Sequence, residues 1–188
     1  MFDKLRAYFE GKTKLTEEQF RLIESVFDSR KLKKGECLQR EGETPKYGGF
    51  VISGCLRSYV VDDSGKEHII QFAPENWWIS EFESAIKNEP AKYFIDAIED
   101  SELVLITRSA SDELRKISPK YQEFVLQATS EAYIQLERRI SSTISLTLEE
   151  RYTELTSNYP DIIQRLPQHM IASYMGLTPE TLSRVRKR

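Results

Sequence analysis

The C-terminal segment of the sequence, residues 165–188, carries side chains of the kind that contact nucleic acid. Its charged members are five cations and one carboxylate, namely Arg165, Arg184, Arg186, Lys187, Arg188 and Glu180. Five positive charges against one negative give the segment a net charge of +4, whereas the whole chain carries −3 at pH 7. The other residues therefore carry −7. An acidic body with one basic end predicts contact with phosphate groups through one small surface.

Three small or apolar residues in this segment have the spacing of a helix-turn-helix. Ala172 lies four positions before Gly176, and Leu182 follows six positions after that glycine. Alanine lets two helices approach closely, glycine turns the chain at positive φ, and leucine fills the angle between the helices. Thr178 and Pro179 are suited to the N-cap and the first position of the second helix. The pattern predicts two short helices that meet at an angle.

The outward positions of the second helix predict how it reads DNA. Arg184 can donate two hydrogen bonds to O6 and N7 of a guanine, and Glu180 can accept from a cytosine amine or orient Arg184. Pro179 lies at the N-terminal end of the same surface. Phosphate contacts are expected from Gln168, which begins the first helix, and from Thr178, Thr181, Ser183, Lys187 and Arg188.

A longer helix is expected to precede this motif and to join two copies of the chain. Ser118 and Pro119 are suited to its N-cap and first position. A stripe beyond them repeats every three or four residues: Tyr121, Val125, Ala128, Ala132, Gln135 and Arg139. We expect this stripe to face the same helix of a second subunit, whereas the alternative is a single helix lying on its own domain. A capping box at Thr147 to Glu150 then begins another helix, which ends before Pro160.

The first two thirds of the chain predict a small helical cover followed by strands. Residues 1–28 have helical spacing, with Thr16 as a candidate N-cap. Residues 31–107 contain short runs of strand-forming residues separated by turns, and residues 62–65 have the composition of a hairpin turn. Short, frequent strands without alternating helices predict an antiparallel barrel or jelly roll.

Several other classes of protein are disfavoured by the composition. Cys37 and Cys55 are too few for an iron–sulfur cluster, and His68 and His169 are far apart in the sequence, so we expect no metal and no cofactor. No apolar run is long enough for a signal peptide or a membrane span, which predicts a cytoplasmic protein without a membrane partner. An enzyme on a cupin-like roll would need clustered histidine and carboxylate ligands, so we expect no enzyme.

Two stretches make the sequence resemble the cyclic-AMP receptor protein/FNR family of bacterial transcription regulators. LTPETLSRVRK is similar to that family's recognition helix, with Glu180, Thr181 and Arg184 forming a Glu-Thr-x-x-Arg core. PENWWISEFES is similar to the corresponding stretch of members that bind no nucleotide. The sequence departs at Pro179, where many members carry an arginine that contacts a base, and this departure concerns which DNA sequence is preferred.

The resemblance implies an α+β fold in three parts. These are an antiparallel β-roll or jelly-roll sensor similar to a cyclic-nucleotide-binding domain (residues 1–110), a dimerisation helix region (111–146) and a C-terminal winged helix-turn-helix (147–188). It further implies a regulator that binds a palindromic operator in double-stranded DNA as a homodimer, with RNA polymerase as another candidate partner. The alternative is a ligand-binding or protein-interaction module that binds no DNA.

The resemblance also suggests where an effector would bind. Members that bind cyclic nucleotides carry Gly-Glu-x-x-Gly here, followed by an arginine that holds the cyclic phosphate. This sequence keeps Glu81, fills the glycine positions and has Lys92 in place of the arginine, and a lysine lacks the bidentate fork. Trp77 and Trp78 would crowd a phosphate. Cyclic AMP is therefore disfavoured, and these four residues are a candidate pocket for an unidentified small molecule.

Overall fold

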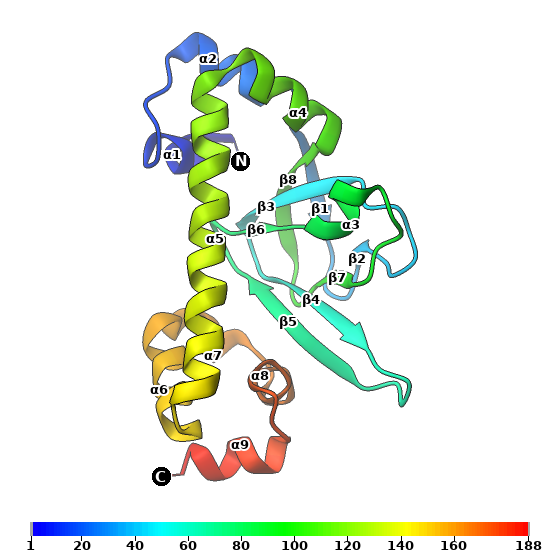
Figure 1. The fold of residues 1–188 in the computed structure, drawn as a ribbon, viewed down its shortest axis with the longest axis vertical. Coiled ribbons are helices and arrows are strands. Elements are labelled where there is room, and N and C mark those ends of the chain that lie inside the picture. Colours follow the sequence, from blue (N-terminus) through cyan, green and yellow to red (C-terminus); the bar gives the residue numbers. More distant parts are fainter. Residues whose placement is uncertain (1, 188) are drawn as a thin grey trace. The chain divides into compact units, whose positions relative to one another are not determined.

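A computed structural model describes residues 2–187 of the chain, apart from the side chain of residue 162 (Figure 1). Its helices and strands are, in chain order, α1 (Phe2–Glu10), α2 (Glu17–Glu24), β1 (Asp28–Leu32), β2 (Cys37–Gln39), β3 (Tyr47–Ser53), β4 (Leu56–Val61), β5 (Glu67–Ala73), β6 (Trp78–Ile79), α3 (Phe82–Lys87), β7 (Phe94–Ala97), β8 (Ser101–Thr107), α4 (Arg108–Ile117), α5 (Pro119–Ser145), α6 (Leu148–Asn158), α7 (Pro160–Arg165), α8 (Gln168–Met175) and α9 (Pro179–Val185). Among the described residues, no helix is both long enough and apolar enough to cross a bilayer.

The chain forms two compact units. Unit 1 runs to Val60 and resumes over Ile70–Gln127, whereas unit 2 consists of Val61–Ile69 and the chain from Ala128 onward. The helix α5 is continuous, so its first turns belong to unit 1 and the remainder to unit 2. The hairpin formed by β4 and β5 is divided in the same way, because its tip belongs to unit 2. The expected domain boundaries after residues 110 and 146 stay a prediction.

Unit 1 contains two four-stranded sheets. Their strand orders are β1-β8-β3-β6 and β2-β7-β4-β5, and the pairs β1–β8, β3–β8, β3–β6, β2–β7 and β4–β7 are all antiparallel. Their core consists of buried aliphatic side chains, namely Leu32, Val51, Leu56, Ala73, Ile79, Ile95, Ala97, Leu103 and Leu105. The antiparallel β-roll predicted from the sequence is confirmed.

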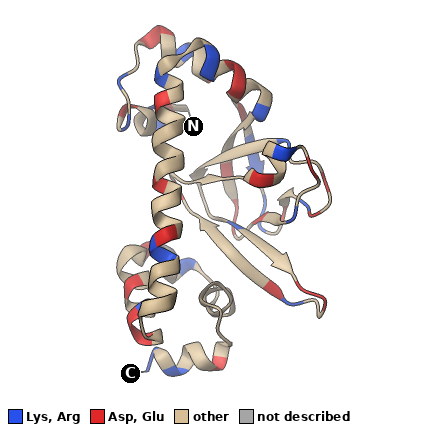
Figure 2. Cartoon of the chain, in the orientation of Figure 1, with Lys and Arg blue, Asp and Glu red and all other residues tan. Residues whose placement is uncertain are grey.

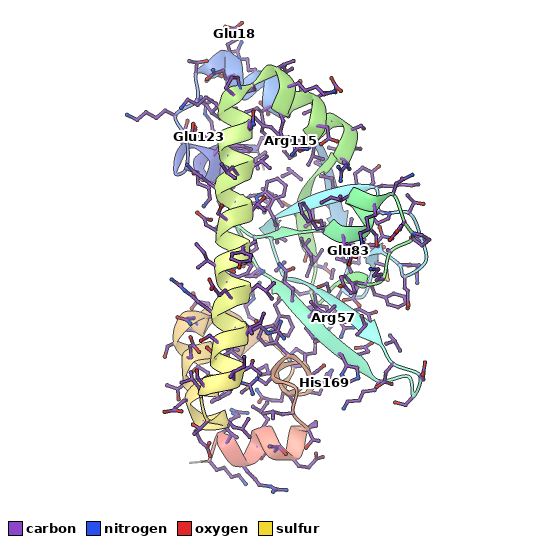
Figure 3. The ribbon with its side chains drawn as sticks, in the orientation of Figure 1. Glu18, Arg57, Glu83, Arg115, Glu123 and His169 are labelled. Atoms are coloured by element: carbon purple, nitrogen blue, oxygen red, sulfur yellow. The ribbon has the colours of Figure 1, made fainter. Side chains whose placement is uncertain are left out.

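The opposite face of β4 and β7 carries a buried ion pair. Arg57 lies opposite Asp96 in the register, and its Nε and Nη2 donate to the two carboxylate oxygens over 2.8 and 3.0 Å. The two side chains are only 8% and 10% exposed (Figure 3 labels Arg57). Tyr59 and Phe94 stack beside them with ring centroids 5.3 Å apart. Because each charge has its partner, the pair fixes the register of two strands without leaving a buried charge unpaired.

An aromatic cluster joins α1 and the start of α5 to the first sheet. Phe9 lies 3.9 Å from Phe124, and Tyr8 lies 4.7 Å from Phe50, measured between ring centroids. Trp78 contacts the same cluster, 5.2 Å from Phe50 and 6.1 Å from Phe124. Large rings bury much apolar area, so this cluster attaches the N-terminal helices to the β-roll.

Local signals in the sequence give most of the element ends. Thr16 and Thr147 each begin a helix with a complete capping box, and the Ser118 hydroxyl accepts a hydrogen bond from the Tyr121 N–H at the start of α5. The turn of the β4–β5 hairpin closes through a 2.8 Å bond from the N–H of Gly65 to the carbonyl of Asp62. These sequence predictions are confirmed.

The structure contains three elements that the sequence analysis did not predict or placed differently. The strand β1 already begins at Asp28, inside the segment expected to be helical, and four of its five residues are exposed. The helix α3 interrupts the region expected to contain only strands, with Glu81 as its N-cap. The short helix α7 begins at Pro160. Each of these elements is short and lacks a marked apolar periodicity, which is the signal that sequence reasoning depends on.

Gly54 offers a test of the β3–β4 turn. Its φ is +90°, and a Cβ there would lie 2.3 Å from the Ser101 hydroxyl and 2.7 Å from the Asp100 carbonyl. We expect Gly54→Ala to lower the free energy of unfolding by at least about 2 kcal/mol, because a backbone clash adds to the cost of the left-handed conformation. Urea unfolding measures this change.

The matched control is Gly65→Ala in the hairpin turn. Gly65 has φ +81° but no atom within 4 Å of a Cβ, so only the conformational cost of roughly 1 kcal/mol applies. Equal losses for the two variants would contradict the close approach at Gly54.

Candidate nucleic-acid interface

The helices α8 and α9 form a pair whose apolar residues point inward. Ala172 is fully buried, Leu182 and Met175 are 1% and 5% exposed, and Val185 is 8% exposed. Gly176 ends α8 at φ +72°, in the left-handed conformation that the spacing predicted. The helix-turn-helix geometry expected around Ala172, Gly176 and Leu182 is therefore present in the chain.

The turn between the two helices is closed by backbone hydrogen bonds. The last four carbonyls of a helix have no partner within the helix, so other donors must satisfy them. At the end of α8, the N–H of Leu177 donates to the Ala172 carbonyl over 2.8 Å. The N–H of Gly176 donates to the Ser173 carbonyl over 3.0 Å.

Two arginines satisfy the remaining pair of carbonyls. Arg139 of α5 donates from Nη2 to the Tyr174 carbonyl over 3.0 Å, and its guanidinium lies 4.0 Å from the centroid of the Tyr174 ring. Arg151 of α6 donates from Nη2 to the Met175 carbonyl, also over 3.0 Å. Positive charges at a helix C-terminus also interact favourably with the negative end of the helix dipole. Together with the backbone bonds, these contacts give every carbonyl of the last turn a donor.

The start of α9 is capped as its sequence predicts. The Thr178 hydroxyl accepts from the N–H of Thr181 over 3.3 Å, and Pro179 occupies the first turn. Two hydrogen bonds lower the pKa of the Glu180 carboxyl below its usual value. The larger contribution comes from the backbone N–H of Glu180 itself, and the next from the Thr178 hydroxyl. Glu180 is therefore a carboxylate at neutral pH, which is the form that accepts hydrogen bonds from a base.

The residues expected to contact DNA lie at the surface. Those exposed on α9 and its cap are Thr178, Pro179, Glu180, Ser183, Arg184 and Lys187, and Arg186, which was given no contact, is exposed beside them. Thr181 is half-buried, and Gln168 is exposed at the start of α8. Figure 2 shows the carboxylate near the start of α9 and the cations toward its end. Arg188 and any wing that follows α9 lie outside the described residues.

The helix α5 places the expected dimer stripe differently from the prediction. Tyr121 is 2% exposed, stacks 6.2 Å from Phe9 and shares a 3.0 Å hydrogen bond with Ser111. Burial raises the pKa of Tyr121, so it stays a neutral phenol. Its assignment to a subunit interface is wrong, because its own subunit already covers it. Arg139 is half-buried against Tyr174.

The other members of that stripe are more accessible. Val125 and Ala128 are half-buried, whereas Ala132 and Gln135 are exposed, and their role in a dimer stays a prediction. A separate set of large apolar side chains is exposed on α5, and we refer to it as the apolar face: Tyr133 (66%), Leu136 (53%), Ile140 (53%) and Ile144 (80%). It borders a shallow groove and lies roughly a third of a turn around the helix from the predicted stripe.

The candidate effector residues are divided between a core and a surface. Trp77 packs on the sheet core, and Trp78 belongs to the aromatic cluster. Glu81 is 1% exposed, and its Oε2 accepts from the N–H of Ser84 over 2.9 Å. Within the described part of the chain, Glu81 Oε1 and the Ser84 hydroxyl are buried without a hydrogen-bond partner.

Lys92 is held at the surface by a carboxylate of α3. Its Nζ lies 2.9 Å from Oε2 of Glu83, and the two side chains are 47% and 44% exposed (Figure 3 labels Glu83). Hydrogen bonds from Lys87 and Lys92 lower the pKa of Glu83 to about 2. The described interactions of Lys92 thus include none with Trp77, Trp78 or Glu81. The pocket stays a prediction.

The histidines and cysteines form no cluster that could hold a metal. His68 pairs with Asp62 in the hairpin tip at 2.7 Å, and His169 is exposed on α8. Cys37 and Cys55 form no disulfide among the described residues. No group of three histidine, cysteine, aspartate or glutamate side chains suited to a metal ion occurs among residues 2–187.

Known proteins are similar to the β-roll and to most of the chain. Residues 29–118 match the model of the cyclic nucleotide-binding domain. The transcriptional activator protein FnrA of Stutzerimonas stutzeri is 28% identical over 175 residues, which cover 87% of this chain and 71% of the relative. The transcriptional activator protein Anr of Pseudomonas aeruginosa is 25% identical over 180 residues, covering 90% and 73%. FixK2 from Bradyrhizobium japonicum has a similar structure, with a TM-score of 0.75, 21% identity and coverage of 86% and 83%.

The described chain combines a β-roll that matches the cyclic nucleotide-binding domain with a C-terminal helix pair of helix-turn-helix geometry. Over most of its length the chain is similar to proteins named as transcriptional activators, and it shares the fold of FixK2. The relatives are named as regulators of transcription and not as enzymes.

Sequence reasoning missed the residues that hold α8 in place. Arg139 was assigned to the dimer stripe, and neither Arg151 nor Ser173 was singled out. Their partners lie 24 to 106 residues away along the chain. A sequence contains no periodic signal for contacts of this kind.

The tight approach of α8 and α9 can be tested at Ala172. We expect Ala172→Leu to lower the free energy of unfolding by about 1–3 kcal/mol, because added methyl groups have no room at a fully buried position. Urea unfolding followed by circular dichroism measures the change. Ala7→Leu on the exposed side of α1 is the control and should stay within about 0.5 kcal/mol of the wild type. A neutral Ala172→Leu variant would mean that the two helices do not meet there.

Proposed function

We propose that this protein binds a palindromic operator in double-stranded DNA as a homodimer, with α9 of each subunit in a major groove. The main support for this proposal is the separation of buried and exposed side chains on α9. The helix α9 buries Leu182 and Val185 and exposes Glu180, Ser183 and Arg184 on its other side. The exposed groups comprise a carboxylate, a hydroxyl and a guanidinium, which together can pair with base edges and phosphates.

The charge distribution around α9 supports the same proposal. Arg184, Arg186 and Lys187 are exposed within four consecutive positions, whereas the rest of the chain is acidic. A basic surface of this kind attracts the phosphate backbone, and the acidic body limits contact elsewhere. The relatives FnrA and Anr are named as transcriptional activators, which is consistent with a role at DNA. An activity on DNA implies a cytoplasmic location.

The apolar face of α5 supports assembly as a dimer. Tyr133, Leu136, Ile140 and Ile144 recur every three or four residues and are all at least half exposed. A second copy of the same face is the occupant that fits, because an isologous contact pairs apolar with apolar side chains and generates a two-fold axis. A palindromic site requires that symmetry, with half-sites about 34 Å apart.

An unidentified small molecule acting on unit 1 is part of the proposal. Glu81 supports it, because one oxygen of this buried carboxylate and the nearby Ser84 hydroxyl have no partner among the described residues. A ligand that donates hydrogen bonds would satisfy Glu81. A cyclic nucleotide fits poorly, since Lys92 is paired with Glu83 and Trp78 fills an aromatic cluster. RNA polymerase stays a candidate partner with no residue assigned to it.

The role of Arg184 can be tested by selection from random duplexes. We expect the wild-type protein to enrich a palindrome, and Arg184→Ala to bind that duplex about 10- to 100-fold more weakly because a bidentate contact to guanine is lost. Fluorescence anisotropy measures both affinities. The control is Arg138→Ala, which removes an exposed cation of α5 outside the helix-turn-helix. A wild-type protein that enriches no duplex would favour the alternative, a ligand-binding or protein-interaction module.

The dimer contact can be tested at Ile140. We expect Ile140→Glu to weaken self-association at least about tenfold, because a carboxylate would be buried in an apolar contact. Sedimentation velocity over a range of concentrations measures the change. Ile134→Glu is the matched control, since Ile134 is 43% exposed on another side of α5. If both variants stay dimeric, the apolar face is not the interface.

A further inference from the structure

The strand β5 lies at the edge of its sheet. The strand order β2-β7-β4-β5 places β5 at the end of the sheet. An edge strand presents unpaired N–H and C=O groups on its outer side, and such groups need other partners. Alternate residues of a strand present these groups in the same direction. A group that both donates and accepts can therefore satisfy positions i and i+2 together.

Ser173 of α8 satisfies this edge with a single hydroxyl. Its Oγ donates to the Glu67 carbonyl over 2.9 Å and accepts from the Ile69 N–H over 3.0 Å. Both residues lie in the part of β5 that belongs to unit 2, together with α8. Ile69 is 4% exposed, so its N–H lies at a buried position where an unsatisfied donor would be costly. One side chain thus replaces two bonds that a neighbouring strand would have made.

This contact completes a set of attachments that hold α8 from three other elements. Arg139 attaches it to α5 and Arg151 attaches it to α6, both through carbonyls of its last turn. Ser173 lies in that same turn and attaches it to β5. The helix α9 follows α8 after a closed turn, so any movement of α8 also moves the exposed residues of α9.

We propose that Ser173 is a positioning residue for DNA binding, which acts by joining α8 to the edge of β5. The inference rests on the proposed function, since it concerns the same helix-turn-helix. The contact between Ser173 and β5 would make the affinity for DNA depend on the β4–β5 hairpin, although no hairpin residue is assigned a contact with DNA. The Ser173 hydroxyl already donates its one proton to Glu67 and accepts from Ile69, so it has no proton left to donate to a base in this arrangement.

The experiment compares Ser173→Ala with Ser173→Thr in the full chain. The probe is the fluorescein-labelled palindrome selected by the wild-type protein, and anisotropy is measured at several salt concentrations. We expect Ser173→Ala to bind about fivefold to tenfold more weakly, because the binding-competent orientation of α8 is less populated. The slope of log Kd against log salt should stay unchanged, because no phosphate contact is removed. Ser173→Thr, which keeps a hydroxyl, should restore most of the affinity.

Hydrogen exchange provides a measurement that does not depend on DNA. Without DNA, Ser173→Ala should speed exchange of the Ile69 N–H, whereas exchange in β8 should not change. Ser25→Ala is the matched control, since the Ser25 hydroxyl bonds only to the Leu22 carbonyl of its own helix. This control should alter neither the affinity nor the exchange of Ile69.

The possible outcomes separate this inference from the function on which it rests. If the wild type enriches a palindrome and Ser173→Ala binds it with unchanged or greater affinity, the inference is overturned and the proposed function stands. Weaker binding that Ser173→Thr does not restore, or exchange that accelerates throughout the chain, would indicate general destabilisation and also overturn it. A wild-type protein that binds no duplex overturns both.

Discussion

The carbonyl groups in the last turn of α8 must find donors outside the helix, and the way they do so determines how α9 is presented. The Gly176 and Leu177 N–H groups close the turn, which is possible because Gly176 adopts φ +72° at low cost. Arg139 and Arg151 supply the other two donors from different helices. The backbone thus sets the angle between α8 and α9, whereas the arginines fix where that pair lies within unit 2. These contacts therefore determine where the exposed residues of α9 lie within unit 2.

Much of the fold could be predicted because its signals are local. Capping residues such as Thr16, Thr147 and Thr178 act within three residues of themselves, and the hairpin turn at Gly65 does the same. The strand β1 could not be found in this way, since four of its five residues (DSRKL) are polar and exposed. Its position comes from antiparallel pairing with β8, more than sixty residues later in the chain. No local pattern records such a pairing.

The candidate site, too, could be predicted where its signals are local and could not be predicted where it depends on tertiary contacts. The exposed side of α9 follows from the apolar positions of Leu182 and Val185, which the sequence shows directly. On α5 the helical period alone did not reveal which face was accessible, because Phe9 of α1 packs against Tyr121. Large apolar side chains would have been a better guide to the free face than small and polar ones. The anchors of α8 depend on tertiary contacts of arginine and serine, and these residue types also occur throughout ordinary surfaces.

The two tryptophans of the chain are adjacent, and both lie in unit 1. Trp78 packs against Phe124 in the first turns of α5, whereas the helix-turn-helix contains tyrosine as its largest chromophore. The ultraviolet emission excited at the red edge of protein absorption therefore originates entirely from the β-roll and its aromatic cluster. Any change of that emission when an oligonucleotide binds to α9 would report an effect in unit 1, so the native chain contains its own optical sensor of communication between its two units.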